Sequence, residues 1–304
     1  MHTKENFIVS SFYKFVYVPE PETVKILLSR KLAQYDIKGT FIIGKEGING
    51  SFSILQENIF NICKIIENLI SDNIKFKLQK INEHSFLRLK IKLKEEIVTL
   101  GKKNINDPKN TPRYLDPESW EKLLKNRDAV IIDTRNEYES NVGSFKFSIE
   151  TKTKNFRDFP VWIEKNKEKL KNKKIGIFCT GGIRCEKASN YLMKKGYNNV
   201  YQLEGGIIEY LAKTKNKNKM WSGECFVFDE RVTINERLKK GSYSQCFACR
   251  SPITLKEKKS KFFKPGVSCP KCFKKKSLKQ KKRYKERHKQ ILISKQKGIK
   301  HLGS

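Results

Sequence analysis

One heptapeptide of this 304-residue chain has the residue types that sulfur chemistry requires: Cys179-Thr180-Gly181-Gly182-Ile183-Arg184-Cys185. The apolar run 174–178 before it predicts a short buried strand, and 186–194 after it predicts a helix, so a strand-to-helix loop is expected. Backbone N–H groups of such a loop, the positive end of the helix and the charge of Arg184 would converge on the Cys179 sulfur. They would lower the pKa of the thiol and make Cys179 a nucleophilic thiolate.

The Cys-x4-Arg spacing and the paired glycines of this loop resemble the active-site loop of rhodaneses. Thr180, Gly181, Gly182 and Ile183 are expected to wind around an anionic group attached to the sulfur, because glycine permits the tight backbone. Phosphatases built on the same idea usually have one more residue between Cys and Arg, so the shorter loop favours sulfur chemistry. The alternative is a structural cysteine buried at a strand end.

Three further residues are candidates for accessory roles beside this loop. Asp133 and Arg135 end a neighbouring predicted strand, where they could place charge at the site or pair with each other. Cys185 could resolve an oxidised Cys179 as a disulfide, or it could only pack.

Two CxxC pairs near the C-terminus predict a metal site. Cys246 and Cys249 are followed, after nineteen residues, by Cys269 and Cys272. Four thiolates satisfy tetrahedral Zn²⁺ and can fold a segment too polar to bury a core, as in a zinc ribbon or treble clef. Because four protein ligands leave no open position, the zinc is expected to be structural.

The charge of the chain predicts a polyanionic partner. Lys and Arg total 65 against 32 acidic residues, a net of +33. Residues 251–304 contain nineteen Lys or Arg and two acids, a net of +17. We expect a basic helix here that binds RNA through Lys281, Lys282, Arg283, Tyr284 and Arg287, with Tyr284 able to stack on a base. The alternative is a solvated tail that binds nothing specific.

The remaining pattern predicts three parts: a ferredoxin-like β-α-β-β-α-β sandwich over 1–100, an α/β domain with a parallel sheet over 120–219, and a zinc-binding basic region over 220–304. Residues 101–119 are a linker by composition. The Gly47-Ile48-Asn49-Gly50 stretch is expected to be a tight turn, with a substrate-facing role as the alternative. No signal peptide or membrane span is apparent, and cysteines in CxxC pairs are typical of metal or catalytic sites, so a cytoplasmic protein is expected.

Together these motifs resemble the rhodanese-domain tRNA uridine hydroxylases, which make 5-hydroxyuridine at the wobble position of tRNA. The resemblance covers most of the chain: 47–50, 114–117 with Trp120, 133–139, 156–160, 179–189, 203–207, 223–231 and the cysteine pairs. It implies an oxygen-dependent oxidoreductase that acts on the anticodon region of tRNA, with O2 as co-substrate. It also implies that Cys179 is the active-site cysteine, carrying a persulfide.

Two other functions stay open. A sulfurtransferase would use the same loop without needing zinc or a basic tail. An RNA-binding zinc protein would use its α/β domain only as a scaffold. No dinucleotide-binding fingerprint is present, so a bound nicotinamide or flavin is not indicated, and the reductant and the oligomeric state stay open.

Overall fold

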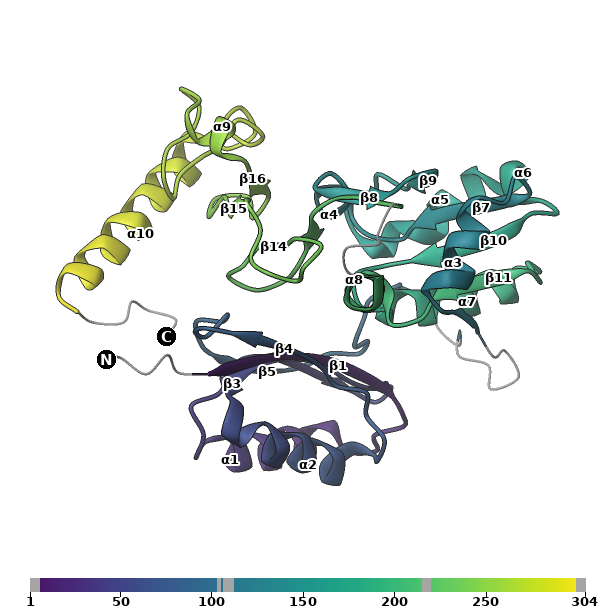
Figure 1. Ribbon diagram of the computed structural model, residues 1–304. Coiled ribbons are helices and arrows are strands. Elements are labelled where there is room, and N and C mark those ends of the chain that lie inside the picture. Colours follow the sequence, from purple (N-terminus) through teal and green to yellow (C-terminus); the bar gives the residue numbers. More distant parts are fainter. Residues whose placement is uncertain (1–5, 103–104, 106–111, 215–219, 299–304) are drawn as a thin grey trace.

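The computed structural model describes residues 6–102, 105, 112–214 and 220–298. Parts of two expected boundaries, 103–104 and 106–111 in the linker and 215–219 at the end of the α/β domain, lie outside the described residues, as do 1–5 and 299–304. The described chain forms an N-terminal domain, a central α/β domain and a C-terminal region that ends in a long helix (Figure 1).

The N-terminal domain is the expected ferredoxin-like sandwich. Its elements are β1 (Phe7–Phe15), α1 (Pro21–Leu32), β2 (Lys38–Gly44), β3 (Gly47–Leu55), α2 (Ile59–Ile70), β4 (Lys77–Ile81) and β5 (Leu89–Leu93). The sheet order is β4-β1-β3-β2-β5, with β5 parallel to β2. Ile62 and Ile66, four residues apart on α2, are fully buried in the core with Phe41 and Phe52. Both helices cover one face of the sheet, which leaves the other face toward the rest of the chain (Figure 1).

The prediction of a tight turn over Gly47–Gly50 is wrong: the turn is formed by Lys45 and Glu46, and Gly47–Gly50 are the first residues of strand β3. Gly47 has φ +135°, and a Cβ at this position would collide with the carbonyl oxygen of Lys14. Asn49 donates to the carbonyl oxygen of Ile97 at 3.1 Å. These contacts give the stretch a structural role in joining the strands to the segment that leaves the domain.

The central domain has the expected parallel sheet. Its elements are β6 (Arg113–Leu115), α3 (Pro117–Leu124), β7 (Ala129–Asp133), α4 (Glu137–Ser140), β8 (Gly143–Phe145), β9 (Ser148–Glu150), α5 (Phe159–Lys165), α6 (Lys167–Leu170), β10 (Lys174–Phe178), α7 (Ile183–Lys194), β11 (Val200–Leu203) and α8 (Gly206–Thr214). The order β6-β11-β10-β7-β9 places β10 at the centre. Two cores flank the sheet, one against α3 and α8 and the other against α5 and α7. The ligand edge of such a sheet is at the carboxyl ends of its strands.

The domain begins earlier and ends later than the sequence pattern predicts. β6 lies inside the expected linker, because Tyr114 and Leu115 pair with Gln202 and Leu203. β12 (Trp221–Gly223) pairs with β8, so the start of the C-terminal region completes the central domain. Strands of three residues are too short to show a periodicity, and neighbouring prolines make β6 look like a linker.

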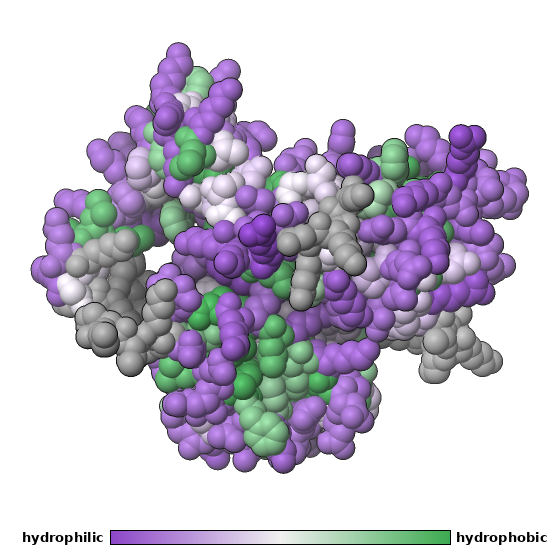
Figure 2. Space-filling view, viewed as in Figure 1, coloured by the Kyte–Doolittle hydropathy of each residue, from purple (hydrophilic) through white to green (hydrophobic). Residues whose placement is uncertain are grey.

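The C-terminal region consists of short elements around the cysteine pairs. After β12 come β13 (Cys225–Phe226), β14 (Thr233–Ile234), β15 (Ser244–Gln245), β16 (Pro252–Ile253), α9 (Leu255–Lys258) and α10 (Leu278–Gln296). No helix in the described part of the chain is long and apolar enough to span a bilayer. Hydrophilic side chains cover most of the face seen in Figure 2, apart from a hydrophobic patch over the N-terminal domain.

Candidate active site

Cys179 lies at the carboxyl end of the central strand β10, as the sequence predicts. The backbone N–H of Gly182 donates to the Cys179 Sγ at 3.1 Å. Gly182 has φ +101°, and a Cβ here would lie 2.8 Å from the Tyr13 hydroxyl, so both backbone and space favour glycine. α7 begins at the next residue, Ile183, and its positive end therefore adjoins the sulfur.

The pKa of the Cys179 thiol lies well below its ordinary value, although burial opposes this. A hydrogen bond from Cys185, the charge of Arg184 and the backbone N–H groups of these two residues all stabilise the anion. The pKa of Cys185 is correspondingly raised by its burial and by the neighbouring anion. The pair therefore consists of a Cys179 thiolate and a Cys185 thiol that donates to it, which fits the predicted nucleophile.

The carbonyl groups of the loop point away from the sulfur because donors outside the loop hold them. At the start of α8, the N–H of Ile207 donates to the Cys179 carbonyl at 3.0 Å, and that of Ile208 donates to the Thr180 carbonyl at 3.1 Å. Gly206 permits this approach, since a Cβ there would lie 2.6 Å from the Cys179 oxygen. With the carbonyls turned outward, N–H groups face inward to the sulfur.

The charge of Arg184 helps to lower the pKa of Cys179, as predicted, but its guanidinium hydrogen-bonds to Glu139. Its Nη1 and Nη2 donate to the two carboxylate oxygens of Glu139, each at 2.7 Å, and Nη2 also contacts the Thr180 hydroxyl at 3.5 Å. Both side chains of this ion pair are buried. The Glu139 carboxylate keeps the pKa of Arg184 raised although burial opposes this. Arg184 therefore acts on the sulfur through its backbone N–H and across space, with its charge partly balanced.

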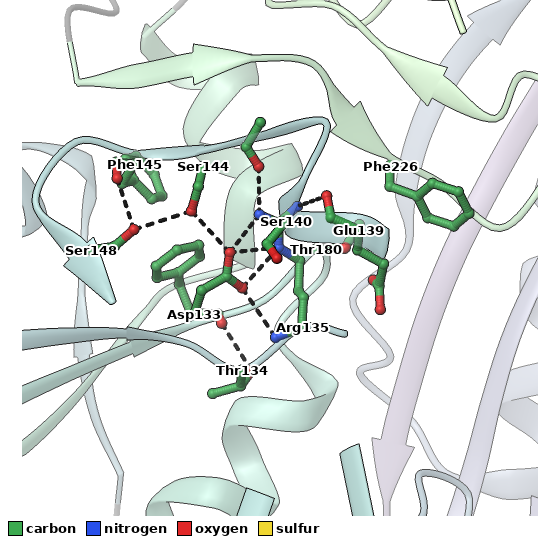
Figure 3. Close-up of polar contacts among 12 residues, drawn as sticks. Asp133, Thr134, Arg135, Glu139, Ser140, Ser144, Phe145, Ser148, Thr180 and Phe226 are labelled. Atoms are coloured by element: carbon green, nitrogen blue, oxygen red, sulfur yellow. Dashed lines mark hydrogen bonds and ion pairs between the residues drawn. The ribbon is translucent and has the colours of Figure 1, made fainter. Parts of the chain in front are cut away.

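Asp133 and Arg135 pair with each other, which was the structural alternative (Figure 3). The Arg135 guanidinium donates to both Asp133 oxygens, at 2.9 and 2.6 Å, and also to the carbonyl oxygens of Glu139 (3.2 Å) and Gly143 (2.6 Å). Ser144 adds a hydrogen bond to Asp133 at 2.9 Å. This buried network holds the backbone of Glu139, so it positions the partner of Arg184 without contacting the sulfur.

The N-terminal domain covers the loop, which the sequence analysis missed. Lys77 donates its Nζ to the carbonyl oxygens of Gly181 and Gly205, the latter at 2.8 Å. The Tyr13 hydroxyl donates to the Glu186 carboxylate at 2.9 Å. Lys187, buried on α7, forms ion pairs with Glu46 at 2.8 Å and Glu96 at 2.6 Å.

Glu186 gathers polar groups from both domains beside the loop. Besides Tyr13, its carboxylate accepts from the Tyr114 hydroxyl at 3.0 Å and from Gln202 Nε2 at 3.2 Å. Burial raises the pKa of Glu186, although these three donors oppose the shift. Burial, followed by the nearby Glu186, also raises the pKa of the Tyr13 and Tyr114 hydroxyls. The Tyr114 ring is half-exposed, so an aromatic surface adjoins the Glu186 carboxylate.

Cys179 itself has no exposed surface. On one side it adjoins the polar loop and the Lys77 amine, and on the other it packs into the hydrophobic core against α5 and α7. Because the sulfur has no exposed surface, a substrate reaches it only after residues around it move.

The four predicted metal ligands meet at one point. The sulfurs of Cys246, Cys249, Cys269 and Cys272 all lie within 4.8 Å of one another. Separations of 4.0, 3.7 and 3.8 Å for three pairs match the roughly 3.8 Å expected between thiolates at about 2.3 Å from a tetrahedral Zn²⁺. The cluster therefore fits zinc, with no fifth ligand position needed.

The basic helix α10 forms as expected, but one residue of its predicted RNA surface is buried. Tyr284 is 9% exposed, and its ring lies between the guanidinium groups of Arg283 (5.6 Å) and Arg287 (5.1 Å). Arg287 also donates to the Phe247 carbonyl beside the first zinc knuckle, at 2.6 Å. The proposed stacking of Tyr284 on a base does not agree with this burial. Lys282 and Arg283 are exposed, whereas Lys281 is half-buried over the Phe273 ring at 4.1 Å.

The central sheet, with a cysteine loop at the end of its middle strand, defines a rhodanese-type domain. Accordingly, residues 116–213 match the family model of the Rhodanese-like domain. Residues 7–97 match the UPF0176 acylphosphatase like domain. With both domains in this order, the chain has the architecture of the tRNA uridine(34) hydroxylase (UPF0176) family.

Similar solved structures include wild-type EanB, with 20% identity, a TM-score of 0.28 and a match covering 34% of this chain and 25% of EanB. EanB with ergothioneine covalently linked to a persulfide shows 20% identity, a TM-score of 0.27 and coverage of 31% and 24%. The rhodanese-like domain of an Anabaena sp protein, Alr3790, shows 18% identity, a TM-score of 0.30 and coverage of 37% and 80%. This chain thus spans about a quarter of the EanB chains that it matches.

Proposed function

We propose that this protein hydroxylates the wobble uridine of tRNA to 5-hydroxyuridine, with Cys179 as the catalytic residue. The observation that carries the proposal is the Cys179 sulfur, held as an anion by the Gly182 N–H at 3.1 Å in a chain of this architecture. An anionic sulfur at neutral pH is the nucleophile that addition to a pyrimidine ring requires.

The proposed reaction consumes uridine, O2 and a two-electron reductant, and it yields 5-hydroxyuridine, water and the oxidised reductant. The Cys179 sulfur adds to C6 of the uracil, and the resulting enolate carbon C5 reacts with O2 to form a C5 hydroperoxide. Two electrons from the reductant, with two protons, cleave the O–O bond, which leaves a hydroxyl on C5 and releases water. Loss of the thiolate from C6 together with the C5 proton restores the ring double bond. In a second route, a persulfide on Cys179 is itself the redox-active group. In both, the loop N–H groups stabilise developing negative charge, which is worth a few kcal/mol per donor in known enzymes.

A tRNA substrate suits the distribution of charge. The uridine must be extruded to enter a pocket in a small α/β domain, while distant cations hold the phosphates. Lys282, Arg283, Lys285 and Lys289 are exposed on α10 and are suited to that second role. In this proposal, base binding at the loop moves Tyr13 and Lys77 aside, so substrate binding and separation of the two domains are coupled.

The test is mass spectrometry of tRNA nucleosides from a strain that lacks the gene, complemented with wild type, Cys179→Ala or Cys63→Ala. Cys63 is a matched control, because it lies on α2 and far along the chain from the loop. We expect wild type and Cys63→Ala to restore 5-hydroxyuridine and Cys179→Ala to fail. Growth under ¹⁸O2 should label the new hydroxyl. Restoration by Cys179→Ala, or an unlabelled hydroxyl, would contradict the proposal.

A sulfurtransferase is the second candidate, because the Cys179 loop and the Rhodanese-like match favour it equally. Purified protein incubated with thiosulfate and cyanide would then form thiocyanate, and undermodified tRNA incubated under O2 would stay unchanged. If Cys179→Ser restored the nucleoside, the rhodanese domain would instead be an inactive scaffold of an RNA-binding zinc protein.

A further inference from the structure

Lys77 brings a positive charge from the N-terminal domain to the carbonyl side of the rhodanese loop. It is the first residue of β4, and its Nζ donates to the carbonyl oxygens of Gly181 and Gly205. In the part of the chain that the structure describes, no carboxylate lies within 4.0 Å of this amine. Its charge therefore acts directly on the two peptide groups that it contacts.

One of those peptide groups also holds the catalytic sulfur. The Gly181 carbonyl and the Gly182 N–H belong to the same peptide bond, which is planar and directs the two groups in opposite directions. Lys77 binds the oxygen end, and the Cys179 sulfur accepts from the nitrogen end at 3.1 Å. A cation on the oxygen fixes the plane of this peptide and increases the positive partial charge on its N–H.

Arg184 is the residue expected from the sequence to supply this charge, but its guanidinium is matched by Glu139 through two 2.7 Å hydrogen bonds. The charge of Arg184 still favours the Cys179 anion, but the adjacent Glu139 carboxylate offsets part of its effect at the sulfur. Among the described residues no carboxylate forms an ion pair within 4.0 Å of Lys77. A second cation at the loop thus comes from the N-terminal domain.

We propose that Lys77 is a positioning residue for the Cys179 thiolate: through the Gly181–Gly182 peptide it aims and polarises the N–H that the sulfur accepts. Ionisation of the sulfur is thereby coupled to docking of the N-terminal domain on the loop. This inference rests on the proposed function, because that function makes Cys179 the nucleophile. The test below measures only the ionisation of the Cys179 thiol. The effect of Lys77 on that ionisation can therefore be confirmed even if the protein does not hydroxylate tRNA, and it can be disproved even if the protein does.

Several charged groups face the Lys77 amine and set its protonation. From the rhodanese domain these are Cys179, Cys185, Glu186 and Glu209, and from β1 the Tyr13 ring, whose centroid lies 5.8 Å from Nζ. The pKa of Lys77 lies below its ordinary value because the amine is buried, although the anionic Cys179 and the two carboxylates oppose this shift. The ammonium and the thiolate therefore stabilise each other.

The experiment is the pH profile of Cys179 alkylation in the full-length protein, read by mass spectrometry of the Cys179 peptide after brief exposure to iodoacetamide between pH 5 and 10. Lys77→Met keeps most of the length of the side chain and removes its charge. We expect the midpoint of the profile to rise by about one pH unit or more, the size typical for losing a nearby opposite charge. Lys77→Arg should retain most of the wild-type midpoint.

Lys75→Met is the matched control, because Lys75 is exposed on the same segment and contacts only Glu204, at 3.4 Å. It should leave the midpoint unchanged. If Lys77→Met accelerated alkylation equally at every pH with an unchanged midpoint, Lys77 would be merely a cover and the proposal would be overturned. If that variant does not fold by circular dichroism, Lys77→Gln takes its place, with the same two outcomes.

Discussion

The buried pair of Arg184 and Glu139 allows a sharp prediction about stability. Two charge-assisted hydrogen bonds of 2.7 Å join the side chains, and both are removed from water. Replacing one member of a buried ion pair typically costs about 3–5 kcal/mol, because the remaining charge stays buried without its partner. In Glu139→Gln one acceptor oxygen survives beside the guanidinium, so we expect the central domain to lose about 3 kcal/mol.

The assay is urea unfolding followed by tryptophan fluorescence. The three tryptophans, Trp120, Trp162 and Trp221, all lie on the central domain or on the strand that completes it, so the signal reports this domain. The transition midpoint should fall while its slope is retained. Glu118→Gln is the control: its ion pair with Lys122 is exposed on α3 and should contribute nothing measurable.

A double variant tests whether the loss of stability comes from the charge that is left without a partner. Glu139→Leu combined with Arg184→Met removes both charges, and it should recover most of the stability lost by Glu139→Leu alone. A loss below about 1 kcal/mol in Glu139→Gln would refute the reasoning, since that value is typical of solvent-exposed pairs. It would mean that Arg184 is free to turn to the sulfur.

Three other predictions concern the zinc module, the basic helix and the thiols. Purified protein should contain one zinc per chain by atomic emission, and Cys249→Ser should lose both the metal and the protease resistance of the C-terminal region, since four thiolates hold it together. Lys282→Glu with Arg283→Glu should weaken tRNA binding and flatten its salt dependence in filter binding, because fewer counterions are released; an unchanged slope would exclude this helix from the RNA surface. Cys63, whose pKa burial and Glu67 raise to about 11, should be alkylated increasingly as the pH approaches 11. Cys179, with its lowered pKa, should instead reach its maximal rate at a lower pH than Cys63 and lose it on acidification, and matching profiles would disprove the thiolate.

Much of the architecture could be predicted because it is encoded locally. Apolar spacing in 59–70 and 174–178 marks a helix with one buried face and a fully buried strand, and the structure contains both. The glycines at 181 and 182 and the spacing of the CxxC pairs are likewise short-range signals. Their geometry follows from a few consecutive residues, so the loop and the metal cluster are found without knowing the rest of the fold.

A helix start near Glu139 is visible in the sequence, but neither its pairing with Arg184 nor the contact of Lys77 with the loop could be predicted. Asn136 and Glu139 form a capping box, and this spacing marks the helix start that places Glu139 beside the loop. Lys77 is one lysine among many in a strand of ordinary composition, and Gly181 lies far along the chain. Tyr284 is similar: its pattern indicates a surface aromatic, but docking of α10 beside the zinc knuckle buries it.

The sequence by itself determined that a cysteine stands in an anion-binding loop after a central strand, and that four cysteines gather to bind a metal, because both depend on residues close together in the chain. Only the tertiary structure decided which charges surround the sulfur. Arg184 turns to Glu139 and Lys77 reaches the loop from another domain, since the partner of a buried charge is chosen by how the domains pack and by the need to satisfy each buried group.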